Sequence, residues 1–166
     1  METFDITSSV VKYSGIFKMS EVYKVAFSIL ADELGYDIEE SKYREKVSSD
    51  GKELEIKWIA EKKISDYYKF RIKVDFFVVG LKDVEVEKSG VKVKMNKGNI
   101  DITIKSSIIT DWEGRWESSP VLRFLQGLFD KYVQRNTFQQ MKARIYEEAY
   151  KFENEMKAFF NLTRFM

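Results

Sequence analysis

The stretch DYYKFRIKVDFFVVG, residues 66–80, is the clearest β-strand pattern in this chain of 166 residues. Apolar side chains occupy one parity of the stretch and charged side chains the other, which is the period of a strand with one buried and one solvent-facing side. The charged parity consists of Lys69, Arg71, Lys73 and Asp75. Phe77 and Val79 make the end apolar on both sides, so we expect the outer face to be covered there or to meet a partner.

The segment before this strand has the same alternation, and we expect the two to form a hairpin. A loop over residues 62–66 sets Trp58 opposite Phe70 and Ile56 opposite Ile72. Most charged side chains on the outer face then find opposite charges across the sheet, which favours an antiparallel arrangement.

Two further turns follow. Ser89-Gly90 is a two-residue hairpin signal, because glycine adopts the positive φ that tight turns require, and it pairs Val86 with Val93. The sequence NKGN at residues 96–99 predicts a second turn. The resulting prediction is an α+β fold with an antiparallel meander of six to seven strands.

The N-terminal part predicts a strand over residues 4–13 that ends at Ser14-Gly15. Apolar residues at helical spacing predict a helix from Met19 to Leu34, which Gly35 ends. Residues 36–47 read as a polar strand, and its charges suit a sheet edge.

The C-terminal part predicts helices. Ser118 or Ser119 can cap a helix that has Pro120 at its first position. A single helix from there to residue 161 would be roughly 60 Å long, whereas a 13-residue strand covers about 43 Å. We therefore expect a bend near Arg135 within one domain (residues 1–166), with residues 137–161 either projecting or folded back.

Composition excludes several kinds of chemistry. The chain has no Cys and no His, which removes disulfides, thiolate nucleophiles, histidine bases and the commonest metal ligands. No catalytic, cofactor or metal motif stands out, so an enzyme is disfavoured. The net charge of +1 gives little attraction to nucleic acid or anionic membranes. The start of the chain lacks a signal-peptide pattern and no apolar run approaches a membrane span, so a cytoplasmic location is expected. Abundant Lys, Glu and Ile with one Pro are typical of thermophiles.

The order of strand, helix, meander and long C-terminal helix resembles the helix-grip fold of the START-like superfamily. That resemblance covers nearly the whole chain and rests on topology. It implies an apolar cavity between the sheet and the C-terminal helix, and a carrier or sensor of a small molecule. The single helix between the first two strands departs from the family. Residues 65–88 and 128–136 also look similar to uncharacterised small archaeal proteins.

The inward row of the sheet and the first C-terminal helix supply the residues that would line such a cavity. They are Trp58, Tyr68, Phe70, Phe76, Phe124, Leu128 and Tyr132. A filled core is the more common outcome, since protein interiors are normally close-packed.

An apolar stripe at three- and four-residue spacing follows the expected bend and suits a helix seam. It consists of Phe138, Met141, Ile145, Phe152, Met156 and Phe159. The stripe can fold back over the outer face near Phe77 and Val79, or it can pair with a second copy of the chain.

Two charged groups are weaker candidates. The basic residues Lys69, Arg71 and Lys73 could hold RNA phosphates, but acids across the sheet neutralise much of their charge. The second group is Asp111, Glu113 and Glu117, whose spacing matches no metal-binding loop. The leading prediction is therefore a non-enzymatic interaction module that forms a homodimer through the C-terminal helix or binds another protein. A carrier of an apolar small molecule is the first alternative, and an RNA- or ribosome-associated protein is the second.

Overall fold

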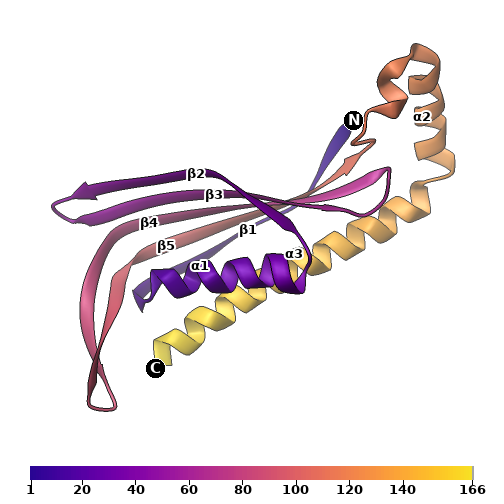
Figure 1. Ribbon diagram of the computed structural model, residues 1–166. Coiled ribbons are helices and arrows are strands. Elements are labelled where there is room, and N and C mark those ends of the chain that lie inside the picture. Colours follow the sequence, from indigo (N-terminus) through magenta and orange to yellow (C-terminus); the bar gives the residue numbers. More distant parts are fainter. Residues whose placement is uncertain (166) are drawn as a thin grey trace.

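The computed structural model describes residues 1–165 and shows an α+β fold in which helices lie on one face of a long, curved antiparallel sheet (Figure 1). The strands are β1 (Glu2–Phe17), β2 (Asp37–Ser48), β3 (Gly51–Lys63), β4 (Tyr68–Lys88) and β5 (Val91–Thr110), arranged in the order β1-β5-β4-β3-β2. The helices are α1 (Met19–Phe27), which continues as a π-helix (Ser28–Glu33), a 3₁₀ helix (Arg115–Ser118), α2 (Pro120–Tyr132) and α3 (Arg135–Phe165).

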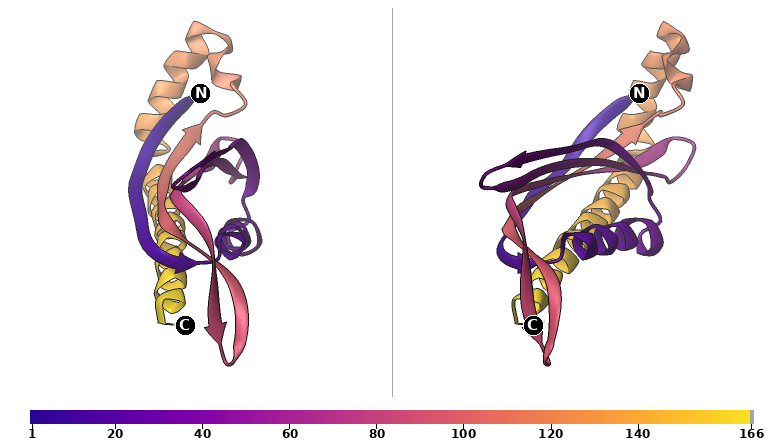
Figure 2. Two further views of the ribbon diagram at one scale, coloured as in Figure 1. Left: turned by 90° about the vertical axis from the view of Figure 1, so that its left-hand side faces the viewer. Right: turned by 60° about the vertical axis from the view of Figure 1, so that its left-hand side comes forward.

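The sheet has five strands, so the prediction of six to seven was wrong. The expected turn at residues 96–99 is absent, and β5 continues through these residues as a single strand. Val84 still pairs with Met95, but Ile100 pairs with Val78 of β4. The β4–β5 pair shifts its register near Gly80, which has a φ of 66°, and the long hairpin bends away from the sheet there (Figure 2). Gly98, which suggested a turn, lies in this bend, where a side chain would come within 3.2 Å of the Val79 and Leu81 backbone.

The register between β3 and β4 differs from the prediction by four residues. Trp58 lies opposite Val74, and Ile56 lies opposite Phe76. The turn between the strands covers residues 64–67 rather than 62–66, and within it Ser65 Oγ accepts hydrogen bonds from the backbone N–H groups of Tyr67 and Tyr68. A shift of four keeps the parity, so the prediction of which side chains face inward holds.

The N-terminal elements agree with the prediction except for one boundary. β1 continues through Ser14 and Gly15, where a break was expected, and reaches Phe17. The first helix starts at Met19 as expected, but its cap comes from the sheet: Asn96 Oδ1 accepts a hydrogen bond from the Met19 N–H at 2.9 Å. β2 lies at the sheet edge, as its charges indicated.

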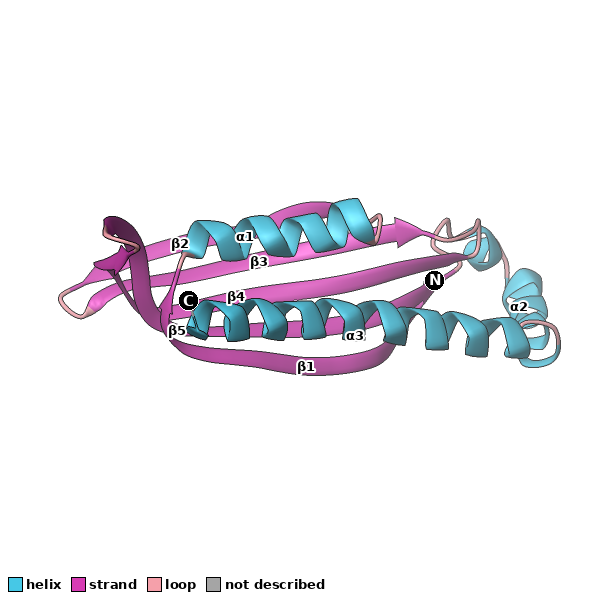
Figure 3. Ribbon diagram, turned by 90° about the horizontal axis from the view of Figure 1, so that it is seen from below, coloured by secondary structure: helices cyan, strands magenta, loops and turns pink. Residues whose placement is uncertain are grey.

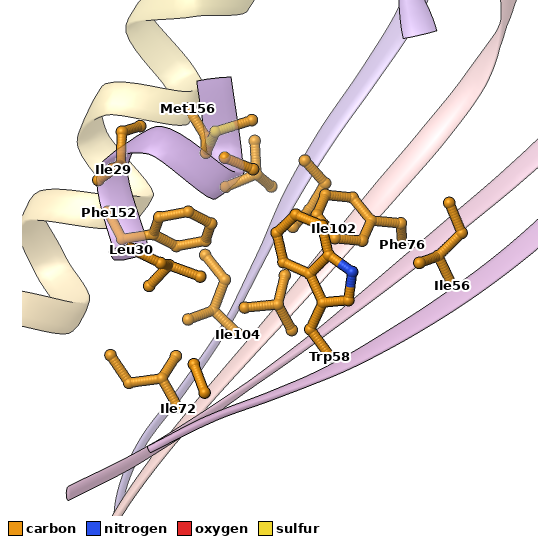
Figure 4. Close-up of a cluster of buried hydrophobic side chains, with 14 of the residues drawn as sticks. Ile29, Leu30, Ile56, Trp58, Ile72, Phe76, Ile102, Ile104, Phe152 and Met156 are labelled. Atoms are coloured by element: carbon orange, nitrogen blue, oxygen red, sulfur yellow. The ribbon is translucent and has the colours of Figure 1, made fainter. Parts of the chain in front are cut away.

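The core lies between the sheet and the two helices α1 and α3, which cover one face (Figure 3). Ile72 and Ile102 both point into it, and Phe152 and Met156 of α3 are fully buried against them (Figure 4). The expected bend near Arg135 is present, and the helix after it folds back along the inner face of the sheet. It does not cover Phe77 and Val79, which are exposed on the outer face.

α2 lies beyond the end of the sheet, so the helix on the sheet is α3 and not the one that begins at Pro120 (Figure 1). None of the helices within the described residues 1–165 is long and apolar enough to cross a membrane.

Truncating one phenylalanine on α3 and one on α2 tests which of these two helices covers the sheet. Phe152→Ala removes a fully buried side chain and should lower the free energy of unfolding by about 3–5 kcal/mol. Phe124→Ala on α2 removes an exposed side chain and should change it by less than about 0.5 kcal/mol. Urea unfolding followed by circular dichroism measures both, and a larger loss for Phe124→Ala would contradict the assignment.

Candidate functional site

The chain between β5 and α2 forms a fixed joint. Asp111 is buried at a φ of 49°, and its carboxylate accepts hydrogen bonds from the backbone N–H groups of Arg115 (3.0 Å) and Trp116 (3.2 Å). This carboxylate therefore caps the 3₁₀ helix. Within residues 1–165, no group of acidic side chains is arranged to hold a metal ion.

The β3–β4 turn braces this joint from the sheet side. Trp112 Nε1 donates a hydrogen bond to the Ser65 carbonyl at 2.8 Å. The ammonium groups of Lys63 and Lys69 lie over the Trp112 ring, at 4.8 and 5.2 Å from its centre. Cation–π contacts and a hydrogen bond to the backbone thus hold the same indole.

The inner side of α2 docks on the same turn. Ser119 caps the helix by accepting a hydrogen bond from the Leu122 N–H, as the sequence predicted. Phe129 stacks on Trp116 with ring centres 5.5 Å apart. The Tyr67 hydroxyl donates a hydrogen bond to Asp130. α2 is therefore held in place at the end of the sheet by side chains on one of its sides.

The other side of α2 is apolar and uncovered. Its members follow three- and four-residue spacing and form what we call the α2 stripe: Val121, Phe124, Leu125, Leu128 and Tyr132. Phe124 is 68 % exposed and Tyr132 is 71 % exposed. Exposed apolar residues gathered on one side of a helix are typical of interaction sites.

The structure separates the seven residues that were predicted to line a cavity. Phe124, Leu128 and Tyr132 belong to the α2 stripe, whereas Trp58, Phe70 and Phe76 are buried under α1 and α3. The Trp58 ring contacts the rings of Phe76 and Tyr23 at centre distances of 4.8 and 4.9 Å, so side chains fill the space around it (Figure 4).

Tyr68, the seventh of these residues, lies at the end of the sheet. There it lines a pocket of about 220 Å³ together with Thr110, Phe138 and residues of the α2–α3 junction. Ligand pockets for drug-sized molecules usually exceed about 300 Å³. This pocket is thus sized for solvent or a very small molecule rather than for a lipid.

The predicted helix seam is largely used within the chain. Ile145, Phe152 and Met156 are fully buried against the sheet. The other three, Phe138, Met141 and Phe159, are half-buried against the same core. These side chains are therefore not free to meet a second copy.

The basic residues on the outer face are partly neutralised. Glu61 forms ion pairs with Arg71 at 2.8 Å and with Lys69 at 3.7 Å. Lys73 is exposed and lies opposite Lys105 on β5. Only a small part of the predicted basic patch remains available to phosphate groups.

Sequence reasoning missed a partly buried polar cluster that fastens α3 to the sheet. Lys62 pairs with Glu148 of α3 and donates a hydrogen bond to the Leu34 carbonyl at 2.8 Å. The Tyr36 hydroxyl donates to the same Glu148 carboxylate at 3.0 Å. Burial, and then the charge of Glu148, raise the pKa of Tyr36 well above its usual range. Nothing local in the sequence connects residues this far apart.

No family model matches this chain, and no curated protein matches it.

Alkaline pH should destabilise the fold through Tyr68, whose hydroxyl donates a hydrogen bond to Gln134 between α2 and α3 at 2.9 Å. Burial, and then the charge of Asp130, raise the pKa of Tyr68 to about 12. The folded state then holds a proton that the unfolded state releases near its usual pKa of about 10, so stability falls as the pH rises from about 10 through 12. Urea unfolding at a series of pH values should show a shallower fall for Tyr68→Phe than for the wild type. Equal slopes would contradict the assignment, and Tyr43→Phe on the exposed β2 strand is the matched control.

Proposed function

We propose that this protein is a non-enzymatic interaction module that binds a partner protein through the α2 stripe. One observation carries the proposal: α2 is anchored beyond the end of the sheet by its inner side, and its other side, the α2 stripe, is apolar and uncovered. Because α2 is already ordered in the free protein, less conformational entropy is lost when a partner binds. Exposed aromatic residues such as Phe124 and Tyr132 are typical anchors of protein interfaces.

The charges around the stripe indicate the kind of partner. Arg123 and Lys131 are exposed on α2, and Arg135 follows at the start of α3. The acid of this helix, Asp130, is engaged with Tyr67 on the inner side. The complementary surface is an amphipathic helix whose apolar face is flanked by acidic residues, because opposite charges at the rim favour the correct orientation.

The two alternatives have less support. A carrier of an apolar molecule needs an internal cavity, and the row of Trp58, Phe76 and Phe152 is packed together instead. The placement of β1 beside β5 and of α3 on the sheet agrees with a helix-grip arrangement, so a START-like origin stays a proposal about fold. An RNA-associated role has only the partly neutralised outer face to draw on.

Binding to designed helical peptides tests the function. One fluorescent peptide carries Leu at helical spacing with Glu flanks, and a second carries the same Leu residues with Lys flanks. The Glu peptide should bind in anisotropy titrations, and Phe124→Glu with Leu128→Glu should weaken it at least about tenfold by placing charges in the interface.

The matched control is Val47→Glu with Val91→Glu, which adds the same charges at exposed apolar positions on β2 and β5. Equal binding by the stripe variant, or a preference for the Lys peptide, would refute the proposed partner chemistry. Co-sedimentation with anionic lipid vesicles that depends on the stripe would instead assign α2 to a membrane surface.

A further inference from the structure

β1 forms one long edge of the sheet, and no other strand of residues 1–165 lies outside it (Figure 3). Along an edge strand, alternate backbone N–H and C=O groups point away from the sheet and are free to pair with another strand. Proteins normally protect such edges with charged side chains, proline or bulges.

The two edges of this sheet are protected very differently. β2, at the far edge, has charged residues at seven of its positions: Asp37, Glu39, Glu40, Lys42, Arg44, Glu45 and Lys46. β1 has none from Ile6 to Val11 (ITSSVV), and its protection is limited to a bulge between Asp5 and Thr7. β1 is therefore the edge that is open to a further strand.

A groove runs beside this open edge. Its walls are residues 6–9 of β1 and the α3 residues Tyr146, Ala149, Tyr150 and Glu153, and its volume is about 380 Å³. Tyr146 and Tyr150 are each more than half exposed, and their rings stack with centres 6.3 Å apart. An added strand would thus meet both free backbone groups and an aromatic shelf.

We propose that a second copy of this chain docks on this edge, with β1 antiparallel to β1 around a two-fold axis at Ser9, so that the two sheets form one continuous sheet. The pattern of β1 is self-complementary in this register. Thr7 lies opposite Val11 of the second copy, and the pairing then steps over the bulged residue Ile6. Asp5 comes opposite Lys12 of the second copy, and the two-fold axis repeats this ion pair.

Charge selects this register over its neighbours. Asp5 and Lys12 both lie on the outer face, because they pair with Ser107 and Asp101 of β5, which have the same parity. Moving the register by two residues in either direction places Asp5 opposite Val10 or Ser14. The axis at Ser9 is therefore the one that joins opposite charges directly across the interface.

The dimer would carry two α2 stripes, although α2 takes no part in the interface between the copies. The start of β1 lies next to α2 in each copy (Figure 1), so an antiparallel pair carries its two α2 stripes at opposite ends. Such a dimer can hold two partners or bind one repetitive partner with higher avidity. The β1 interface and the α2 stripe share no residue, so either proposal can fail alone.

A single introduced thiol tests the two-fold axis directly, because the chain contains no Cys. Directly opposite residues of an antiparallel pair have Cα atoms about 4.5–5.5 Å apart, which a disulfide can bridge. Ser9→Cys should therefore form a covalent dimer on mild oxidation, seen on a non-reducing gel. Ser8→Cys, whose partner would be Val10, and Ser41→Cys on the β2 edge should cross-link much less.

Charge reversal tests the register. The wild type should sediment as a dimer, Asp5→Lys should weaken dimerisation by about tenfold or more, and Asp5→Lys with Lys12→Asp should restore it. Circular dichroism checks that each variant is folded. A strictly monomeric wild type at high concentration would overturn the proposal, as would Ser9→Cys cross-linking no better than Ser41→Cys. A dimer that Phe124→Glu dissociates would place the interface on the α2 stripe instead.

Discussion

The contact between α3 and the inner face of the sheet is the interaction on which the rest of this structure depends. Phe152 and Met156 are fully buried against the isoleucine-rich row of β4 and β5. Burying one such side chain contributes about 1.5–3 kcal/mol. Without α3, the longest strands of the sheet would have an uncovered apolar face, and α1 alone is too short to cover it. The Lys62–Glu148 pair fixes the position of α3 along the sheet as well as its distance from it.

This contact also explains why α2 is exposed. A helix of 31 residues extends about 46 Å, which already takes up most of the length of the sheet. The chain breaks its helix just before Arg135, so the preceding helix has no sheet left to cover and lies past its end. The protein then braces α2 with Asp111, Trp112 and Tyr67 rather than burying it. The exposed apolar side of this anchored helix is the basis of the proposed partner site.

The outer edges of the sheet show a similar asymmetry. β2 projects charged residues along its whole length, as expected of an edge that stays in water. β1 has a neutral stretch beside an aromatic groove on α3. The apolar side of α2 and the neutral part of the β1 edge are thus two surfaces that this chain leaves uncovered.

Local sequence patterns determined much of this fold. The alternation from residue 66 to residue 80 assigned each side chain to its face, and this held even though the register with β3 was wrong, because a shift of four residues preserves parity. Ser119, Pro120 and Gly35 marked helix ends by their own conformational preferences. Local sequence patterns could not show which strands pair with each other or which helix packs on the sheet. NKGN reads locally as a turn, yet unbroken pairing with β1, and pairing with β4 on both sides of a register shift, keep β5 extended through it. The stripes of α2 and α3 have the same spacing, and periodicity cannot say which of them covers the sheet. Only the tertiary structure decided that, since the choice depends on sheet length, on the Lys62–Glu148 pair and on the hydrogen bond between Trp112 and Ser65, all of which involve residues far apart in the chain.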